Sequence, residues 1–432
     1  MNMKNNIHHP DRREFIKTTA LGALSLHLPE FIKKPAPSDT VRVAHIGLGG
    51  MGNNHMNWFQ ALPGVEIVGL CDVDGMHLAD TKKVLDDLQP NNKAELYRDF
   101  RKILDRKDVD VITCATPDHW HAQVAILAFQ AGKDVYGEKP LSFNIREGQK
   151  MLKALNRYDR IFQLGTQIHA GENYHRVAEI IQSGILGKIK KVKLWKTGEP
   201  PIFNPATNQQ VPSHFNYDYW LGPSPYEPYA LEHTHLNYRY FLNYSGGIYQ
   251  DFWCHIADIV WWSIKPTGLK SIDATGERST GAGDTPRWID VDFEFDDLQV
   301  HWSSTPPDEV RGAKDRHIGA YFMGEKGNLI CDYNTKEIEI NGQYMDDLAE
   351  VPHTIIRSPG HQQNFIDSVK SRKQPESNLA YVREMTLPMH LGLISWRLKR
   401  KLLWNANKEK VIDDKEANAF LKRKYRKEYD WI

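Results

Sequence analysis

Residues 41–52 read VRVAHIGLGGMG, and this stretch decides the fold. Its first six residues are mostly apolar and predict a strand, and a helix is predicted from Asn53 to Leu62. Between them, Gly47, Gly49 and Gly52 stand in G-x-G-x-x-G spacing. In that context the first glycine makes a tight turn, the second lets the backbone approach a pyrophosphate, and the third allows close helix–strand packing. The stretch therefore predicts a dinucleotide-binding unit.

The acidic residue at the end of the next predicted strand indicates which dinucleotide binds. Asp72 ends the run VEIVGLCD, 20 residues beyond Gly52, where a carboxylate accepts hydrogen bonds from the adenosine ribose. The same charge repels a 2′-phosphate, and residues 73–77 offer no arginine to bind one. We therefore expect NAD rather than NADP. The predicted contacts are Asp72 and the loop residues Gly47, Leu48, Gly49, Gly50, Met51 and Gly52.

The wider pattern predicts an α/β chain of two domains. Strands are predicted at 65–72, 108–116, 134–136 and 161–165, alternating with helices at 77–88, 120–131 and 144–156. This alternation favours a doubly wound parallel (Rossmann) sheet over residues 39–165. A larger α+β domain is expected over residues 166–432, with an open, mostly antiparallel sheet. Its predicted strands are 188–195, 288–295, 298–304, 317–324 and 328–333, and its predicted helices are 173–182, 361–371 and 385–401.

Composition limits the classes of partner. The 432 residues include 55 basic and 55 acidic side chains, so no net field favours nucleic acid or an anionic membrane. Hydrophobic residues make up 41% and charged residues 25%, which is typical of a soluble protein. The four cysteines show no C-x-x-C pair, so buried structural thiols are expected and no disulfide framework is implied.

The N-terminus has the pattern of an export signal. Residues 8–31 read HHPDRREFIKTTALGALSLHLPEF, in which Arg12 and Arg13 precede a weakly apolar run of about ten residues. That run is too short to span a bilayer, so no stable membrane anchor is expected. We expect residues 1–38 to be a twin-arginine signal and linker, and the protein to be periplasmic. The alternative is a disordered basic tail.

A second group of polar residues lies in YRYFLNYSGGIYQDFWCHIADIVWW, residues 238–262. Asp251, His255 and Asp258 fall at i, i+4 and i+7, on one face of a helix whose other faces are strongly apolar. A buried polar stripe either lines a pocket or is satisfied by internal pairs, and we favour the pocket. The spacing also suits a metal site with His235 as a further ligand. Without a compact His-rich pattern, we expect no metal.

Taken together, these motifs resemble the Gfo/Idh/MocA family, named from glucose–fructose oxidoreductase and inositol dehydrogenase. The resemblance rests on the glycine loop, CDVD, ATPDHWHA, GKDVYGEKPLS and a glycine-then-D-x-x-x-H segment, and it runs from about Val41 to the C-terminus. The leader and the segment PGHQQNFIDSVKSRKQP resemble exported, sugar-directed members of Bacteroidetes-type bacteria. The resemblance implies a Rossmann domain followed by a domain whose open sheet commonly forms homodimers or homotetramers.

It also implies roles for the E-K-P loop. Lys139 would reach the substrate hydroxyl beside the nicotinamide, Pro140 would shape the turn, and Glu138 would lie beside the cofactor ribose. Asp251 and His255 fall on the substrate-binding acid and the catalytic histidine. His255, titrating near neutrality, is expected to act as general base while Lys139 stabilises developing alkoxide charge.

Other residues are expected around the same cleft. Thr116, Pro117, Trp120 and His121 should border the nicotinamide half of the cofactor, although Trp120 or His121 could instead cap the following helix. Gln167, His169 and Arg239 are expected to bind the substrate, with a backbone carbonyl as the alternative partner of Arg239.

The sequence thus predicts an NAD-dependent oxidoreductase acting on a small carbohydrate or glycoside, with oxidation of a ring secondary alcohol at C3. The first alternative is an NAD-dependent glycoside hydrolase or lyase that oxidises C3 transiently, eliminates the aglycone and keeps its cofactor. The second alternative is a non-catalytic sugar-binding protein, which the intact Lys139 and His255 disfavour.

Overall fold

The structure, a computed structural model, describes residues 40–204 and 209–432. The predicted signal and linker, residues 1–38, lie outside the described residues. Among the described residues, no helix combines the length and apolar character that a membrane crossing needs. The four cysteines are all buried and unpaired.

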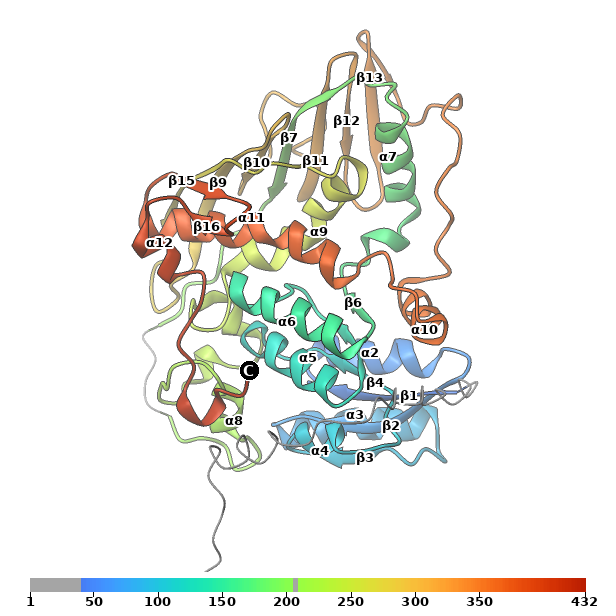
Figure 1. The fold of residues 1–432 in the computed structure, drawn as a ribbon, viewed down its shortest axis with the longest axis vertical. Helices are drawn as coiled ribbons and strands as arrows, with labels where there is room; N and C mark the ends of the chain where they lie inside the picture. Colours follow the sequence, from blue (N-terminus) through green and yellow to red (C-terminus); the bar gives the residue numbers. More distant parts are fainter. Residues whose placement is uncertain (1–39, 205–208) are drawn as a thin grey trace, which may run out of the picture. The chain divides into compact units, whose positions relative to one another are not determined.

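The first part of the fold is a six-stranded parallel sheet in the order β3-β2-β1-β4-β5-β6 (Figure 1). This order is that of a doubly wound sheet, so the predicted fold class is confirmed, although the short strand β3 was not among the predicted strands. Its strands are β1 Val41–Ile46, β2 Val65–Cys71, β3 Glu95–Tyr97, β4 Val111–Cys114, β5 Asp134–Gly137 and β6 Phe162–Leu164. Its helices are α2 Gly50–Gln60, α3 Gly75–Leu88, α4 Arg101–Leu104, α5 His121–Gln130 and α6 Ile145–Tyr158.

Alternation along β1 explains why helices cover both faces of this sheet. Val43 packs in a cluster with Met56 and Phe59 of α2. Its neighbour Ala44 packs in a second cluster with Phe129 of α5. Because successive strand residues point to opposite faces, a strand whose neighbouring residues both pack against helices is buried on both sides. The carboxyl ends of the strands are then the edge left open for a ligand.

The second part is a ten-stranded sheet in the order β14-β13-β12-β11-β7-β10-β9-β8-β15-β16. Every neighbouring pair is antiparallel except β10 with β7. The strands are β7 Ile189–Lys196, β8 Ser271–Arg278, β9 Pro286–Glu294, β10 Gln299–Ser303, β11 Ile318–Gly324, β12 Gly327–Cys331, β13 Lys336–Ile340, β14 Gln343–Met345, β15 Leu402–Asn405 and β16 Lys410–Val411.

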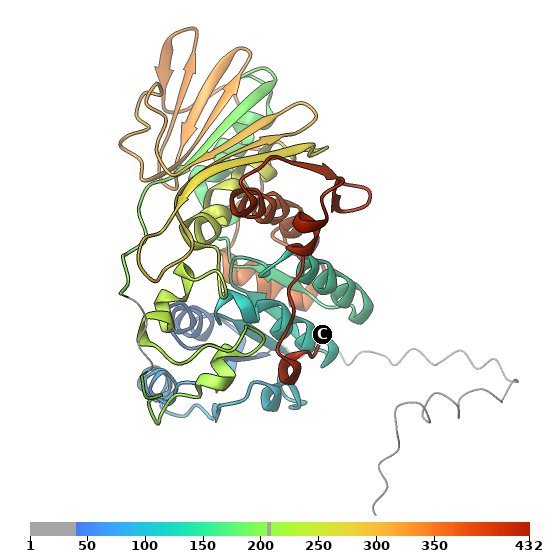
Figure 2. The same ribbon diagram turned by 90° about the vertical axis from the view of Figure 1, so that its left-hand side faces the viewer.

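Helices cover one face of this sheet. Figures 1 and 2 show α9 Gly247–Ser263 and α11 Leu379–Leu398 lying along it. Val192 and Leu194 of β7 are buried on that side, whereas Lys191 and Lys193 lie half-buried on the other. The prediction of an open, mostly antiparallel sheet with one covered face is confirmed.

Segments from the C-terminal half return to the first sheet. Helix α10 His361–Ser371 places Phe365 in the cluster of β1 and α2. Short helix α12 spans Lys415–Ala419, and near the C-terminus Tyr429 packs edge-to-face on Trp120 at 5.8 Å between ring centroids. Thr40–Ile432 accordingly form one compact unit.

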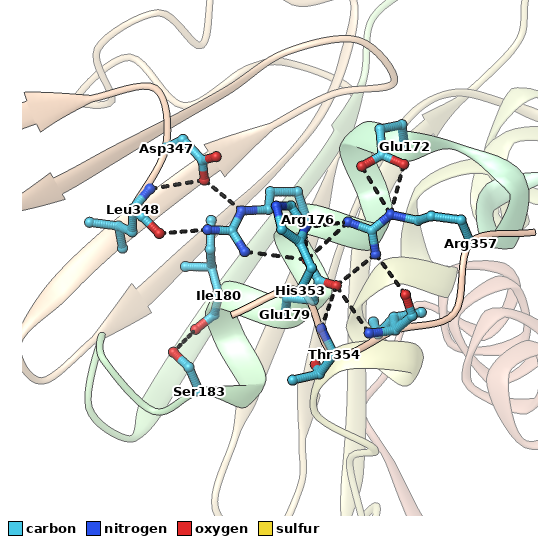
Figure 3. Close-up of polar contacts among 11 residues, drawn as sticks. Glu172, Arg176, Glu179, Ile180, Ser183, Asp347, Leu348, His353, Thr354 and Arg357 are labelled. Atoms are coloured by element: carbon cyan, nitrogen blue, oxygen red, sulfur yellow. Dashed lines mark hydrogen bonds and ion pairs between the residues drawn. The ribbon is translucent and has the colours of Figure 1, made fainter. Parts of the chain in front are cut away.

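An ion-pair network fixes the long connection between β14 and α10 to α7 Glu172–Gln182 (Figure 3). Glu179 is fully buried and accepts hydrogen bonds from Arg357, at 2.6 Å, and from the backbone N–H groups of Thr354 and Ile355. Arg176 reaches Asp347 at 2.6 Å on the other side. The hydrogen bonds that Glu179 accepts from Arg357, Ile355 and Arg176 lower its pKa to about 2, because they outweigh the opposite effect of burial.

Several element boundaries differ from the predicted ones. Helix α2 begins at Gly50, three residues early, because the glycine loop itself supplies its first turn. Helix α11 starts at Leu379, where Asn378 caps it, and ends at Leu398 rather than Lys401. Strands β8 and β13 were not anticipated, since SIDATGER and KEIEI carry glycine or alternating charges that weaken a strand signal.

Candidate active site

The glycine loop joins β1 to α2 at the edge of a cavity. Gly47 has a φ of +83°, and a Cβ there would lie 2.6 Å from the carbonyl oxygen of Ala115, so only glycine fits the turn. A Cβ on Gly52 would lie 1.8 Å from the carbonyl oxygen of Gly47, which marks close packing of helix and strand. Gly49 and Gly50, in contrast, have nothing within 4 Å of such an atom. The open side of the loop faces the first-turn amides of α2, which favour phosphate.

The cavity measures about 420 Å³. Of the residues predicted to hold the cofactor, it is lined by Gly47, Gly49, Gly50, Met51, Asp72, Thr116, Pro117 and Trp120. Its other wall comes from the segment between β7 and α9, residues 197–246, called the β7–α9 segment below. That wall includes Tyr219, Trp220, His235, Tyr238 and Arg239. The described part of this segment contains α8 Tyr217–Leu221, the short 3₁₀ helices η3 Leu231–His233 and η4 His235–Tyr240, and its own aromatic core.

Asp72 directly follows β2, and its side chain lies beside the glycine loop. One carboxylate oxygen accepts the N–H of Leu48 at 2.6 Å, and the other accepts the N–H of Asp74 at 2.7 Å. Leu48 itself is buried and does not line the cavity. The carboxylate is thus held in place by the backbone and keeps lone pairs for two ribose hydroxyls. The open glycines, the amides of α2 and this fixed acid fit a dinucleotide.

Trp120 and His121 have different roles from each other. Trp120 lines the cavity, and its indole N–H donates to the carbonyl oxygen of Trp220 at 3.0 Å. His121 is buried away from the cavity, with its ring nitrogens 2.7 Å from the carbonyl oxygen of Pro140 and 2.9 Å from that of Thr116. The expectation that His121 faces the cofactor is therefore wrong, because it ties the β4 and β5 loops together. Neither side chain caps α5.

Lys139 lies at the carboxyl end of β5 and forms an ion pair with Asp251 of α9. Arg239 of the β7–α9 segment approaches the other oxygen of Asp251 at 3.3 Å. Burial alone would lower the pKa of Lys139, but Asp251 and Glu138 outweigh it and raise that pKa. Burial would likewise raise the pKa of Asp251, and Lys139 and Arg239 lower it instead. The cluster is therefore charged at neutral pH, with two cations around one carboxylate.

His255 lies one turn further along α9. Its Nδ1 is 2.6 Å from the hydroxyl of Tyr333, which follows β12. Burial and, secondarily, the nearby Lys139 lower the pKa of His255 to about 4. The expectation that it titrates near neutrality is wrong for this structure, because its cationic form is desolvated beside another cation. A neutral imidazole hydrogen-bonded to a phenol can accept a proton and exchange it with Tyr333.

Glu138 does not lie in the cofactor cavity, where its predicted position beside the cofactor ribose would place it. Its carboxylate is buried 2.9 Å from Nε2 of His55 in α2 and does not line the cavity. Burial would raise the pKa of Glu138, but the hydrogen bond from His55 lowers it. The structure thus assigns Glu138 to the junction of β5 and α2, where it also faces Lys139.

The third member of the polar stripe is satisfied internally. Asp258 pairs with Nε2 of His169 at 3.1 Å and accepts a hydrogen bond from the hydroxyl of Tyr381. The other ring nitrogen of His169 is 3.2 Å from Glu376. Burial would lower the pKa of His169, but Asp258 raises it to about 9. Because both of its ring nitrogens are engaged, His169 is a structural cation here. Gln167, two residues earlier, has a left-handed backbone conformation with φ of +60°.

The sequence singled out Lys139, Asp251, His255 and Arg239, and the structure brings these four together. It does not bring His169 into that cluster. Tyr333 and His55 were missed, because neither belongs to a recognisable motif and each is placed only by tertiary contacts.

Two models of one family match the chain. The Gfo/Idh/MocA model described as "Oxidoreductase family, NAD-binding Rossmann fold" matches residues 41–166, and the model described as its "C-terminal alpha/beta domain" matches residues 170–431.

Among curated proteins, the chain is similar to a glycosyl hydrolase family 109 protein of Shewanella pealeana. The two are 30% identical over 204 residues, which is 41% of this chain and 44% of the relative. An alpha-N-acetylgalactosaminidase of Shewanella oneidensis is 27% identical over 209 residues, 42% of this chain and 45% of the relative. The matched part thus spans less than half the length of these relatives.

Among solved structures, the WlbA dehydrogenase of Bordetella pertussis, in complex with NADH and UDP-GlcNAcA, has a TM-score of 0.63 and 17% identity, covering 85% of this chain and 98% of that one. A levoglucosan dehydrogenase in complex with NADH and levoglucosan has a TM-score of 0.61 and 16% identity, covering 84% and 99%. At these identities the likeness shows the fold.

Proposed function

The chain belongs to the Gfo/Idh/MocA oxidoreductase family, and we propose that it oxidises a ring secondary alcohol, at C3, of a sugar or glycoside. NAD, when bound in the cavity, supplies the hydride acceptor. One observation carries the proposal: Lys139 and Arg239 converge on the carboxylate of Asp251, Arg239 also lines the cofactor cavity, and His255 lies one turn further along α9.

The four side chains divide the work of removing a hydroxyl proton while the carbon loses hydride. The ammonium of Lys139 stabilises the developing alkoxide, because it is cationic and largely buried. Neutral His255 accepts the proton, with the Tyr333 hydroxyl bonded to its Nδ1. Asp251 and Arg239 offer an acceptor and a donor that can orient neighbouring sugar hydroxyls.

The test is direct. The purified protein is incubated with NAD and a panel of methyl and aryl glycosides, and reduced cofactor is followed together with the keto-sugar. A glycoside that yields both in equal amounts supports the proposal. If the whole panel yields neither with NAD bound, the proposal fails.

A second candidate is net glycoside hydrolysis with a retained cofactor. The relatives named glycosyl hydrolase family 109 favour it. A ketone formed transiently at C3 acidifies the C2 proton, and loss of that proton expels the aglycone before water adds and C3 is reduced again. The pair of His255 and Tyr333 offers a second acid–base group, which this route needs and simple oxidation does not.

We also propose that the protein is exported by the twin-arginine pathway and acts in the periplasm as a homo-oligomer. Arg12 and Arg13 ahead of an apolar run support export. The face of the ten-stranded sheet opposite α9 and α11, on which Lys191 and Lys193 are only half-buried, supports self-association. Fractionation of an Arg12→Lys, Arg13→Lys variant tests export, which should fail, and light scattering tests the oligomeric state.

A further inference from the structure

Three potential metal ligands converge at the rim of the cofactor cavity. The ligand atoms of Asp74, His77 and His235 all lie within 4.8 Å of one another. Asp74 caps α3, His77 lies in the first turn of that helix, and His235 begins η4 of the β7–α9 segment. The two imidazole rings are 4.6 Å apart between centroids, and Nε2 of His235 is 3.1 Å from Oδ2 of Asp74.

We propose that Asp74, His77 and His235 bind one divalent transition-metal ion, with Zn²⁺ the best match. Two imidazole nitrogens and one carboxylate oxygen are a typical Zn²⁺ ligand set, whereas Ca²⁺ and Mg²⁺ prefer oxygen ligands throughout. Tetrahedral Zn²⁺ places neighbouring ligand atoms roughly 3.3–3.5 Å apart. The 3.1 Å separation of His235 Nε2 and Asp74 Oδ2 is close to that value, and three protein ligands leave the fourth position open.

The carboxylate is fixed for this task. Oδ1 of Asp74 accepts the N–H of Met76 at 2.7 Å, which leaves Oδ2 directed at His235. Asp74 is only 2% exposed, whereas the two imidazoles are half-buried at the rim of the cavity. A second carboxylate, Asp72, lies 3.6 Å from Nδ1 of His77 and adds negative potential. A dication there would compensate the charge of these two neighbouring carboxylates.

The position of the site suggests what the metal does. His77 and His235 both line the cavity beside Asp72, but they belong to opposite walls. The two walls already meet through backbone hydrogen bonds, from Gly75 N–H to the carbonyl of His214 at 2.8 Å and from Asn216 N–H to that of Val73 at 3.0 Å. Arg98 donates to both of those carbonyl oxygens at 2.6 Å. A metal ion at the cavity rim would fasten the β7–α9 segment over the adenosine end of the cofactor.

The metal site and its effect on the cofactor can be tested separately. The metal site stands on the geometry of Asp74, His77 and His235 alone. Its effect on the cofactor, a slower exchange of bound NAD, rests on the proposed function.

Metal binding is measured on the full chain without an affinity tag, using Zn²⁺ calorimetry and the visible spectrum of added Co²⁺. The parent should bind Zn²⁺ at this site and give the intense spectrum of a four-coordinate Co²⁺ site. His77→Ala and His235→Ala should each weaken Zn²⁺ binding at least roughly 100-fold. His301→Ala is the matched control, because His301 forms an exposed His–Asp pair at 2.8 Å from Asp292 without a second imidazole. Thermal unfolding without metal should be the same in all four proteins, which excludes misfolding.

Zn²⁺ affinity unchanged in the His77→Ala, His235→Ala double variant would overturn the site, as would no saturable binding by the parent. The second readout is the dissociation rate of NAD with Zn²⁺ and with a chelator. Zn²⁺ should slow release from the parent and not from the double variant. If NAD dissociates from the parent at the same rate with Zn²⁺ and with chelator, the fastening role is overturned, but the metal site is not. A protein that binds Zn²⁺ but never NAD would refute the proposed function instead.

Discussion

The ammonium of Lys139 is ion-paired with the carboxylate of Asp251, 112 residues further along the chain. Lys139 lies two residues after strand β5 of the first sheet, and Asp251 lies in helix α9, which packs on the second. The pair therefore joins the cofactor-binding part of the molecule to the part that carries His255.

Removing the charge of Lys139 should abolish most turnover. Lys139→Met should lower kcat by roughly 10²–10⁴-fold, because the developing alkoxide loses its cation. Asp251→Asn should lower the pKa of Lys139 by removing its partner, so the alkaline limb of the rate profile moves to lower pH. Steady-state kinetics across pH measure both. Lys188→Met is the control, because Lys188 is an exposed residue in a surface pair with Asp297. Lys139→Met turning over like the control would contradict this role.

His255 should act as a base well below neutral pH. Because its pKa is lowered to about 4, the neutral form predominates above that value and is lost only as pH falls through it. The acid limb of kcat/KM should therefore lie near pH 4, where an unperturbed histidine would place it near 6.5. A limb at pH 6–7 that disappears in His255→Ala would show that the imidazole is not desolvated in the working enzyme.

Substitution by alanine should impair cofactor binding at Gly49 and folding at Gly52. Gly49→Ala places a methyl group where no atom lies within 4 Å, so the protein should fold normally and bind NAD more weakly. Gly52→Ala drives its Cβ to 1.8 Å from the carbonyl oxygen of Gly47, so folding itself should suffer. Thermal unfolding and NAD calorimetry separate the two effects. A Gly49→Ala protein with unchanged NAD affinity would place the phosphates elsewhere.

The network around Glu179 should make stability fall in acid. The pKa of Glu179 is depressed to about 2, so its contribution is complete above the unfolded value near 4.5 and is lost as pH falls toward 2. Glu179→Gln should cost about 3 kcal/mol at pH 7 and roughly half of that at pH 3. Urea unfolding at both values measures this. Glu172→Gln removes an exposed partner of the same Arg357 and should cost less than about 1 kcal/mol. An equal cost for both variants at pH 7 would contradict the account.

How far the sequence predicts this molecule depends on whether the determinant is local. The glycine loop, Asp72 and the i, i+4 spacing of Asp251 and His255 are local patterns, and the structure places them as those patterns imply. The partners of Glu138 and His169 are set by tertiary packing, 83 and 89 residues away, and no spacing rule finds them. The lowered pKa of His255 also needs the structure, since its causes are burial and a lysine from another element.

The central claim is that this site oxidises C3 of a sugar by hydride transfer, and product analysis in heavy water tests it most directly. The protein is incubated with NAD and an accepted glycoside, and the sugar products are analysed by NMR while reduced cofactor is quantified. A 3-keto-glycoside and reduced cofactor should form in equal amounts, and both should be lost in Lys139→Met. Free sugar carrying deuterium at C2, with no net reduced cofactor, would contradict the central claim and establish the hydrolytic route instead.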